Sequence, residues 1–263
     1  MTDVASPAGA THPDEHDLDL LDGALYAGDP EPTYAWLRAN APVYWDATNR
    51  LWGVSRYADI VAVEKDTKTF TSSEGFRPNI PGDTSMIGLD DPLHTTRRRL
   101  VSRRFTPRAA GGYEPDVRRV VTELIDAGAA RGGCGGGADL AAPLPAMMIG
   151  WLLGFEDAEW PNLKHWSETT IPAGGGPRYL NDEAILAAAE FHTAAAQLAA
   201  LKRSQPGDDC MTVGATAEVD GAPLTEDDIV SEALLLLDGG AETTRNVIAA
   251  GIFLLSQHPD QRQ

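Results

Sequence analysis

The stretch that most constrains the fold is residues 234–255, LLLLDGGAETTRNVIAAGIFLL. It is preceded by T-E-D-D-I, in which the Thr225 hydroxyl and the Asp228 carboxylate match a capping box. No helix breaker follows before Pro259. The pattern predicts a helix of about 32 residues, roughly 48 Å long, which is well beyond an ordinary globular helix. Because apolar side chains lie almost all round it, we expect it to be buried.

The middle of this predicted helix breaks the rules for a buried helix. Gly239 and Gly240 each cost roughly 1 kcal/mol relative to Ala, and Glu242 places a charge where burial is expensive. Thr243 and Thr244 can bond back to the carbonyl one turn earlier. Such conflicts are typical of functional sites. One interpretation is that the glycines admit a flat ligand while the acid and a hydroxyl relay protons in a dry pocket. The other is a core helix whose glycines admit a neighbouring helix, with Glu242 in an ion pair.

A second motif, D-P-L-H-T-T-R-R-R-L, opens at Asp91, where an Asp-Pro pair predicts the start of a helix. At about 100° per residue, one stripe of this helix holds His94, Arg98, Val101 and Phe105. A His and an Arg four residues apart on an apolar face suit a pair of buried carboxylates. The six arginines in and just after this helix leave another interpretation open, a solvated basic helix or a phosphate or nucleic-acid patch.

Composition limits the function classes. The net charge of −18 disfavours general binding to nucleic acid or anionic membranes. Cys134 and Cys210 have neither metal-ligand spacing nor a disulfide pattern, which favours a reducing cytosol. Residues 1–17 lack a basic and an apolar region, so we expect a disordered tail and no signal peptide. No apolar run is long enough to predict a membrane span. The sequence therefore predicts a cytoplasmic protein.

The rest of the chain predicts a mainly α fold with a small β-hairpin region. Aromatic and β-branched residues predict a hairpin at 42–55, and Asp220-Gly221 predicts a second small one. Further helices are expected at 30–40, 57–65, 113–131, 143–153, 156–166 and 182–203, and loops at 66–90, 131–138 and 169–180. Met86 and Ile87, near the end of the first long loop, either line a pocket for an apolar ligand or pin the loop to the core.

Together the two motifs resemble a known family. G-G-A-E-T-T followed by R-N-x-I is similar to the oxygen-activating helix of cytochrome P-450 haem-thiolate monooxygenases. The D-P-x-H-x-x-x-R pattern followed by R-x-F-T-P-R resembles the haem-propionate helix of the same family. The resemblance implies the cytochrome P-450 fold, with residues 18–263 as the N-terminal part of a single domain. It is closest to actinobacterial members that hydroxylate steroids such as cholesterol.

The resemblance also implies roles for individual residues. Glu242 and Thr243 are expected to assist proton delivery, and Gly239 and Gly240 to flank the groove for O2 over a haem. His94 and Arg98 are expected to hold the haem propionates. Residues expected to meet the apolar substrate are Met86 and Ile87. Residues expected to face a ferredoxin-type electron donor are Arg99, Arg103 and Arg104.

The family's F-x-x-G-x-H-x-C loop, which supplies the axial thiolate, is not found in this sequence. Neither Cys134 nor Cys210 has matching surroundings, so no residue is predicted to bind the iron, and the chain alone is expected to be inactive. A truncated gene, a frameshift or completion by another chain each accounts for this. A different class of function stays open: a non-enzymatic helical protein that binds an apolar ligand or a partner protein.

Overall fold

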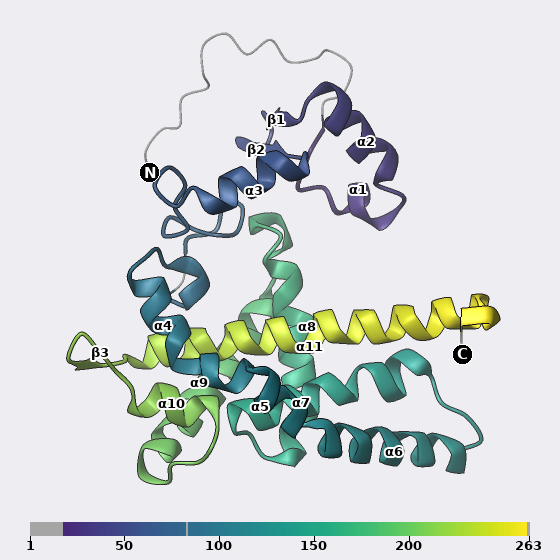
Figure 1. The fold of residues 1–263 in the computed structure, drawn as a ribbon, viewed down its shortest axis with the longest axis vertical. Helices are drawn as coiled ribbons and strands as arrows, with labels where there is room; N and C mark the ends of the chain where they lie inside the picture. Colours follow the sequence, from purple (N-terminus) through teal and green to yellow (C-terminus); the bar gives the residue numbers. More distant parts are fainter. Residues whose placement is uncertain (1–17, 83, 262–263) are drawn as a thin grey trace. The chain divides into compact units, whose positions relative to one another are not determined.

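The computed structural model describes residues 18–82 and 84–261 (Figure 1). Most described residues are helical, and the strands form two small antiparallel sheets, which confirms the predicted fold class. Contacts divide the chain into two compact units, Met1–Thr71 and Ser72–Gln263. We describe each unit by itself, and the predicted single domain stays a prediction. The expected tail at 1–17 lies outside the described residues.

The first unit is built around the predicted hairpin. Its elements are α1 (Gly23–Ala27), α2 (Glu31–Asn40), β1 (Val43–Asp46), β2 (Leu51–Val54) and α3 (Tyr57–Lys65). Asp46 closes the hairpin: its fully buried carboxylate accepts hydrogen bonds from the backbone N–H groups of Asn49 at 2.9 Å and Leu20 at 2.7 Å. Trp45 and Trp52 pair across the strands with ring centroids 5.0 Å apart. The aromatic cross-strand pair explains why this short sequence reads clearly as a hairpin.

The second unit is a helical assembly. In chain order its regular elements are α4 (Leu93–Val101), α5 (Pro107–Gly112), α6 (Glu114–Ala130), α7 (Pro143–Leu153), α8 (Trp160–Ala173), α9 (Asp182–Ser204), α10 (Cys210–Thr216), β3 (Glu218–Val219), β4 (Ala222–Pro223) and α11 (Glu226–Gln257). Short 3-10 helices lie at Met86–Gly88, Ser102–Phe105, Asp157–Glu159, Pro177–Tyr179 and Pro259–Gln261, and a π-helical turn at Gly136–Ala141.

The long helix α11 has the predicted 32 residues and the predicted start. The Thr225 hydroxyl accepts from the Asp228 N–H at 3.1 Å, and the Asp228 carboxylate accepts from the Thr225 N–H at 3.0 Å, which confirms the capping box. The helix passes through the middle of the unit (Figure 1) and packs against α7, α8, α9 and α10. Leu237 and Ala241 on its inner face are at most 3% exposed.

The second half of α11 differs from the sequence-based expectation of burial. Val247 is 73% exposed and Phe253 is 62% exposed. The turn Gly136–Ala141 packs against this half, where Ile252 lies against Gly136, and Arg245 pairs with Glu168 of α8. These contacts cover part of the helix surface and leave side chains such as Val247 exposed.

Two predicted loops are shorter than expected. Helix α8 continues to Ala173, with Pro172 in its last turn, so only part of 169–180 is loop. The end of the glycine-rich segment 131–138 enters the π-helical turn, because the Asp139 carboxylate accepts from the Gly135 N–H at 2.6 Å and pairs with Arg131 at 3.2 Å. A side chain outside the glycine run therefore orders it.

Two helical segments, Gly136–Leu153 and Asp182–Ser204, are long and apolar enough to cross a membrane. Length and composition are weak evidence for a span, because core helices of globular proteins have the same properties. Here Phe191 of α9 and Leu153 of α7 are at most 1% exposed and lie in the same core cluster. Half of the first segment is buried and 28% of the second, so core packing accounts for part of their hydropathy, and the absence of a span stays a prediction.

Candidate functional site

A pocket of about 520 Å³ lies between α4 and α11. Its size is within the usual range for small-molecule sites. Its lining residues are His94, Arg98, Val101, Ser102 and Phe105 from α4 and the turn after it, Leu235 and Leu236 from α11, and Met86 and Ile87. The structure thus brings the whole predicted stripe of the second motif into one pocket. It also brings the predicted substrate residues to the same place.

The polar end of this pocket is formed by two residues one helical turn apart. His94 Nδ1 lies 2.8 Å from the Met86 carbonyl oxygen, which only accepts, so Nδ1 carries a proton. Nε2 is then the nitrogen that can meet a ligand, as a donor when the ring is protonated. The Arg98 guanidinium has no hydrogen bond or ion pair with the rest of the described chain. Both groups suit an anionic ligand.

The glycine pair of α11 has two different surroundings. A Cβ at Gly240 would lie 2.8 Å from Ile149 Cδ1, so close packing of α7 explains that glycine. A Cβ at Gly239 would meet nothing within 4 Å. The Thr243 hydroxyl donates to the Gly239 carbonyl at 2.8 Å, which confirms the back-bonding expected from sequence. Packing accounts for one glycine, and the open side of α11 lies at Gly239 and Thr243.

Glu242 belongs to a row of alternating charges between α8 and α11. Lys164 Nζ lies 2.6 Å from Glu168 Oε2, Glu168 also pairs with Arg245, and Arg245 Nη1 lies 2.9 Å from Glu242 Oε1. The ion pair foreseen in the simpler interpretation of Glu242 is therefore present. The acid is anchored by Arg245, while the neighbouring Thr243 hydroxyl points to its own helix.

Asp238 is a charged residue of this region that sequence reasoning missed. It stands directly before the glycine pair, 3.3 Å from the Thr170 hydroxyl and 3.8 Å from Arg77 Nη2. Burial raises the pKa of Asp238 to about 7, with a smaller contribution from the charge on Glu242 one turn away and against the lowering effect of Arg77 and Thr170. A single Asp at the end of the apolar run LLLLD was a visible signal.

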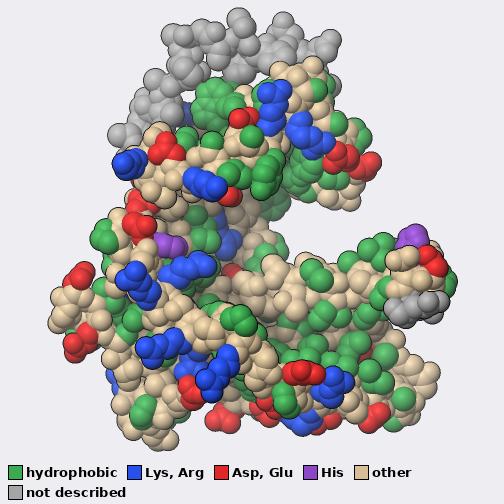
Figure 2. Space-filling view, in the orientation of Figure 1, with side chains coloured by type: hydrophobic (Ala, Val, Ile, Leu, Met, Phe, Trp, Pro, Cys, Tyr) green, Lys and Arg blue, Asp and Glu red, His purple; other side chains and the backbone are tan. Residues whose placement is uncertain are grey.

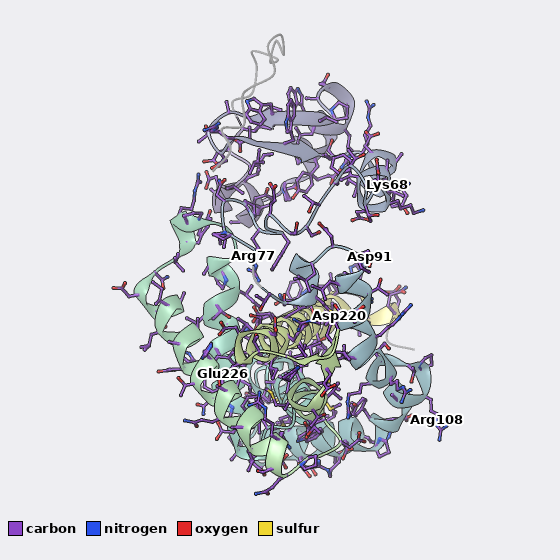
Figure 3. The ribbon with its side chains drawn as sticks, turned by 90° about the vertical axis from the view of Figure 1, so that its left-hand side faces the viewer. Lys68, Arg77, Asp91, Arg108, Asp220 and Glu226 are labelled. Atoms are coloured by element: carbon purple, nitrogen blue, oxygen red, sulfur yellow. The ribbon has the colours of Figure 1, made fainter. Side chains whose placement is uncertain are left out.

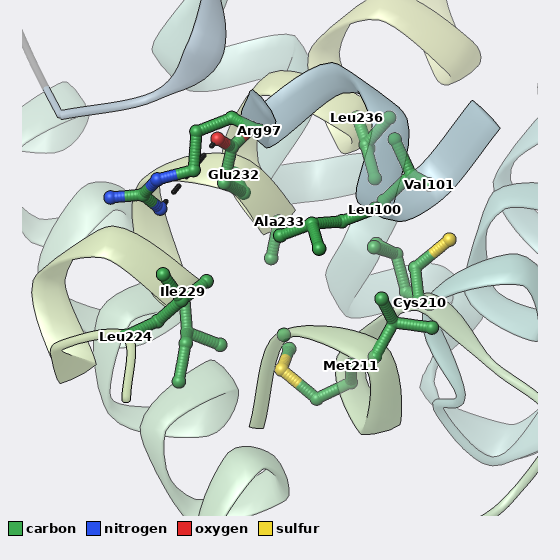
Figure 4. Close-up of a pocket in the computed structure, with 13 residues that line it drawn as sticks. Arg97, Leu100, Val101, Cys210, Met211, Leu224, Ile229, Glu232, Ala233 and Leu236 are labelled. Carbon is green, nitrogen blue, oxygen red and sulfur yellow. Dashed lines mark ion pairs between the residues drawn. The ribbon is translucent and has the colours of Figure 1, made fainter. Parts of the chain in front are cut away.

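Arg97 is the second residue that sequence reasoning missed. Its side chain is buried and reaches two carboxylates of α11. Nη2 lies 2.6 Å from Asp228 Oδ1, and Nη1 lies 3.9 Å from Glu232 Oε1, the pair marked by a dashed line in Figure 4. It also lines a small apolar cavity of about 30 Å³ with neighbours such as Leu100 and Met211. No local feature of the sequence distinguishes Arg97 from the exposed arginines beside it. Its role is to join α4 to α11 next to the 520 Å³ pocket.

The arginines expected to meet an electron donor do not line this pocket: Arg99 lies on α4, and Arg103 and Arg104 lie on the 3-10 helix that follows it. Arg99, Arg103 and Arg104 line a shared depression, together with Asp116 and Asp208. Figure 2 shows Lys and Arg side chains gathered over the region of α4 and α5. Arg104 already donates to Asp208 at 2.7 Å and is largely covered. Arg99 and Arg103 are the exposed members of this basic face.

Neither cysteine lines the pocket that contains His94 and Arg98. Cys210 is buried in α10, and burial raises the pKa of its thiol to about 11, so it stays protonated. Cys134 is exposed beside Gly128. No group of three or more potential metal ligands occurs among the described residues. The side chains that line the pocket fit the carboxylates and the apolar face of a haem, and the absence of an axial ligand for its iron stays a prediction.

Known proteins match nearly the whole chain. It is 36% identical over 250 residues to a steroid C26-monooxygenase of Mycolicibacterium smegmatis, covering 93% of this chain and 62% of that protein. The structure of Mycobacterium marinum cytochrome P450 CYP268A2 in complex with pseudoionone has 30% sequence identity and a TM-score of 0.80, and the match covers 95% of this chain and 67% of that one. CYP109E1 from Bacillus megaterium, solved with testosterone, has 32% identity and a TM-score of 0.74 over 86% of this chain and 60% of its own.

These similarities identify the class. The chain belongs to the cytochrome P450 family, whose matching members are monooxygenases. It spans 62% of the length of the steroid C26-monooxygenase that it resembles. No family model matches the chain. The resemblance to actinobacterial steroid-hydroxylating members, inferred from the two motifs, is confirmed.

Proposed function

We propose that this chain forms the propionate-binding and oxygen-facing part of a haem-dependent monooxygenase that hydroxylates an apolar small molecule, steroid-like or another lipid. The observation that carries the proposal is the 520 Å³ pocket, which joins two anion-binding side chains to apolar residues of α4 and α11. A haem matches this combination, because it is an apolar disc with two carboxylates at one edge. When bound, the haem supplies the activation of O2 at its iron.

His94 and Arg98 hold the two carboxylates in this proposal. The planar guanidinium of Arg98 pairs with a carboxylate through two parallel N–H groups. The Met86 carbonyl fixes the His94 ring, so that Nε2 is the nitrogen left for the ligand. The Met86 backbone thus serves the haem site, while its buried side chain and the half-exposed Ile87 line the pocket for the substrate.

Thr243 and Glu242 do not line the 520 Å³ pocket; they lie further along α11 than its lining residues Leu235 and Leu236, and in this proposal they deliver protons on the oxygen-facing side of α11. The Thr243 hydroxyl donates to the Gly239 carbonyl and keeps its lone pairs available as acceptors on the open side of α11. Glu242 is held by Arg245, so its carboxylate must turn away from this ion pair to pass a proton on. Arg245 and Glu168 therefore set where the acid rests.

Arg99 and Arg103 would attract the acidic surface of a ferredoxin-type electron donor. Arg104 contributes less, because Asp208 already neutralises it. Attraction between exposed charges weakens with salt, since the screening length is about 10 Å at 0.1 M. Reversing the charge of Arg99 and Arg103 is therefore expected to slow reduction at low salt only.

Haem titration of matched variants tests the proposal. Arg98→Ala and His94→Ala are expected to weaken haem binding about tenfold each, corresponding to about 1.4 kcal/mol for one charge-assisted contact. Arg99→Ala, on the other face of the same helix, is the control and is expected to bind haem normally. Wild-type haem affinity in both site variants would overturn the proposal. Binding of apolar ligands by a protein that never takes up haem would favour the non-enzymatic alternative.

A further inference from the structure

We propose that Asp238 and Arg77 together bind a hydroxyl group of the substrate, so that the substrate is a neutral apolar molecule carrying an alcohol. This inference rests on the proposed function, because it places the substrate over the same stretch of α11. The inference goes beyond the proposed function by naming a specificity-determining pair of residues and the polar group that they recognise.

The pair lies where three segments of the second unit meet. Arg77 comes from the loop that also carries Met86, Thr170 comes from the last turns of α8, and Asp238 comes from α11. Arg77, labelled in Figure 3, extends from its loop toward Asp238 of α11. Asp238 directly precedes Gly239, where α11 has its open side. The cluster is therefore next to the proposed oxygen-facing surface.

Gly174 makes room for the guanidinium. A Cβ built at Gly174 would overlap Arg77 Nη1, so the Arg77 side chain occupies the place that any other residue would fill. The backbone of Gly174 has ordinary helical angles, φ −65° and ψ −12°, which alanine adopts without strain. An added methyl group would thus displace Arg77 and leave its charge unchanged.

The contact between Arg77 and Asp238 leaves space for a bridging atom. Their nearest nitrogen and oxygen are 3.8 Å apart, whereas a direct hydrogen bond between such ions is about 2.7–2.9 Å long. Neither side chain is sealed off, since 33% of Arg77 and 13% of Asp238 remain exposed. A ligand oxygen can therefore reach both groups with a small movement of the longer side chain.

The charges around the pair select the kind of ligand group. Arg77 repels a ligand cation, and Glu242, together with Asp238 above pH 7 where Asp238 is ionised, repels a ligand carboxylate. A purely apolar ligand would remove water from both ionisable groups and leave nothing in its place, which is costly. A hydroxyl satisfies both, because its O–H donates to the Asp238 carboxylate and its oxygen accepts from Arg77.

A matched pair of ligands tests this assignment in the haem-loaded protein. The probes are cholesterol and cholestene, which lacks only the hydroxyl, and binding is measured by calorimetry. We expect the wild-type protein to prefer the alcohol about tenfold, and Asp238→Leu and Gly174→Ala to lose that preference while binding cholestene at least as well. Gly251→Ala, at a position of α11 where an added Cβ would meet nothing within 4 Å, is the control and keeps the preference.

Equal affinity for the two probes in the wild-type protein, or no binding of either, would overturn the inference. So would a preference that survives in both Asp238→Leu and Gly174→Ala. The absorbance of the bound haem, recorded on the same samples, reports separately on the proposed function. Normal haem absorbance with no preference for the alcohol would therefore reject hydroxyl binding by Asp238 and Arg77 without contradicting the proposed haem site.

Discussion

Replacing Arg97 by Met is expected to cost this protein a large share of its stability. The Arg97 side chain is only 7% exposed, and its two carboxylate partners, Asp228 and Glu232, are 15% and 14% exposed. Removing the cation leaves two nearly buried negative charges one turn apart on α11. Breaking a buried ion pair by removing one partner typically costs about 3–5 kcal/mol. The Thr225 hydrogen bonds to Asp228 remain, so we expect the lower end, about 3 kcal/mol.

Urea unfolding followed by tryptophan fluorescence measures this loss. Arg99→Met, on an exposed neighbour of the same helix, is the control and is expected to change the free energy of unfolding by less than about 0.5 kcal/mol. In a protein that already carries Asp228→Ala, adding Arg97→Met should lower the free energy of unfolding by much less than it does in the wild-type protein, because one carboxylate partner is already gone. Equal costs in the two backgrounds, or a stable Arg97→Met, would refute the assignment of Arg97 as the link between α4 and α11.

Four further predictions follow from single contacts. Gly239→Ala is expected to raise the free energy of unfolding by up to about 1 kcal/mol through helix propensity. Gly240→Ala is expected to lower it, because the new methyl group meets Ile149. Thermal unfolding of the two variants compares these effects. Thr225→Ala is expected to cost about 1 kcal/mol through the lost cap, and the same assay measures it. Burial raises the pKa of Asp238 to about 7, so the folded protein binds the extra proton and its stability falls as pH rises from about 4 to 7. Asp238→Asn should flatten urea-derived stability across that range, and an unchanged slope would contradict the buried position of this carboxyl. With Thr243→Ala, oxygen consumed without product should rise in the complete enzyme, and full coupling would refute the relay.

The features that were predictable from sequence are local ones. The start of α11 depends on Thr225 and Asp228, which are three residues apart, and its end on the nearby Pro259. The stripe of His94 and Arg98 depends on helical periodicity alone. Each of these signals lies within a few turns of one helix, so no knowledge of the tertiary structure was needed to see it.

The residues that were missed depend on partners far away in the sequence. Arg97 is separated from Asp228 by more than a hundred positions, and nothing local distinguishes it from the exposed Arg99. Arg77 meets Asp238 from a distant loop, and its guanidinium occupies space that a side chain at Gly174 would fill. The exposure of Phe253 likewise depends on which elements lie beside α11, and helical periodicity does not contain that information.

The central claim is that the pocket between α4 and α11 binds haem through its carboxylates. The most direct test compares haem with its dimethyl ester, in which both carboxylates are blocked, by equilibrium titration. The claim predicts that the wild-type protein binds haem at least tenfold more tightly than the ester and that Arg98→Ala with His94→Ala removes the difference. Equal binding of haem and ester by the wild-type protein would contradict it.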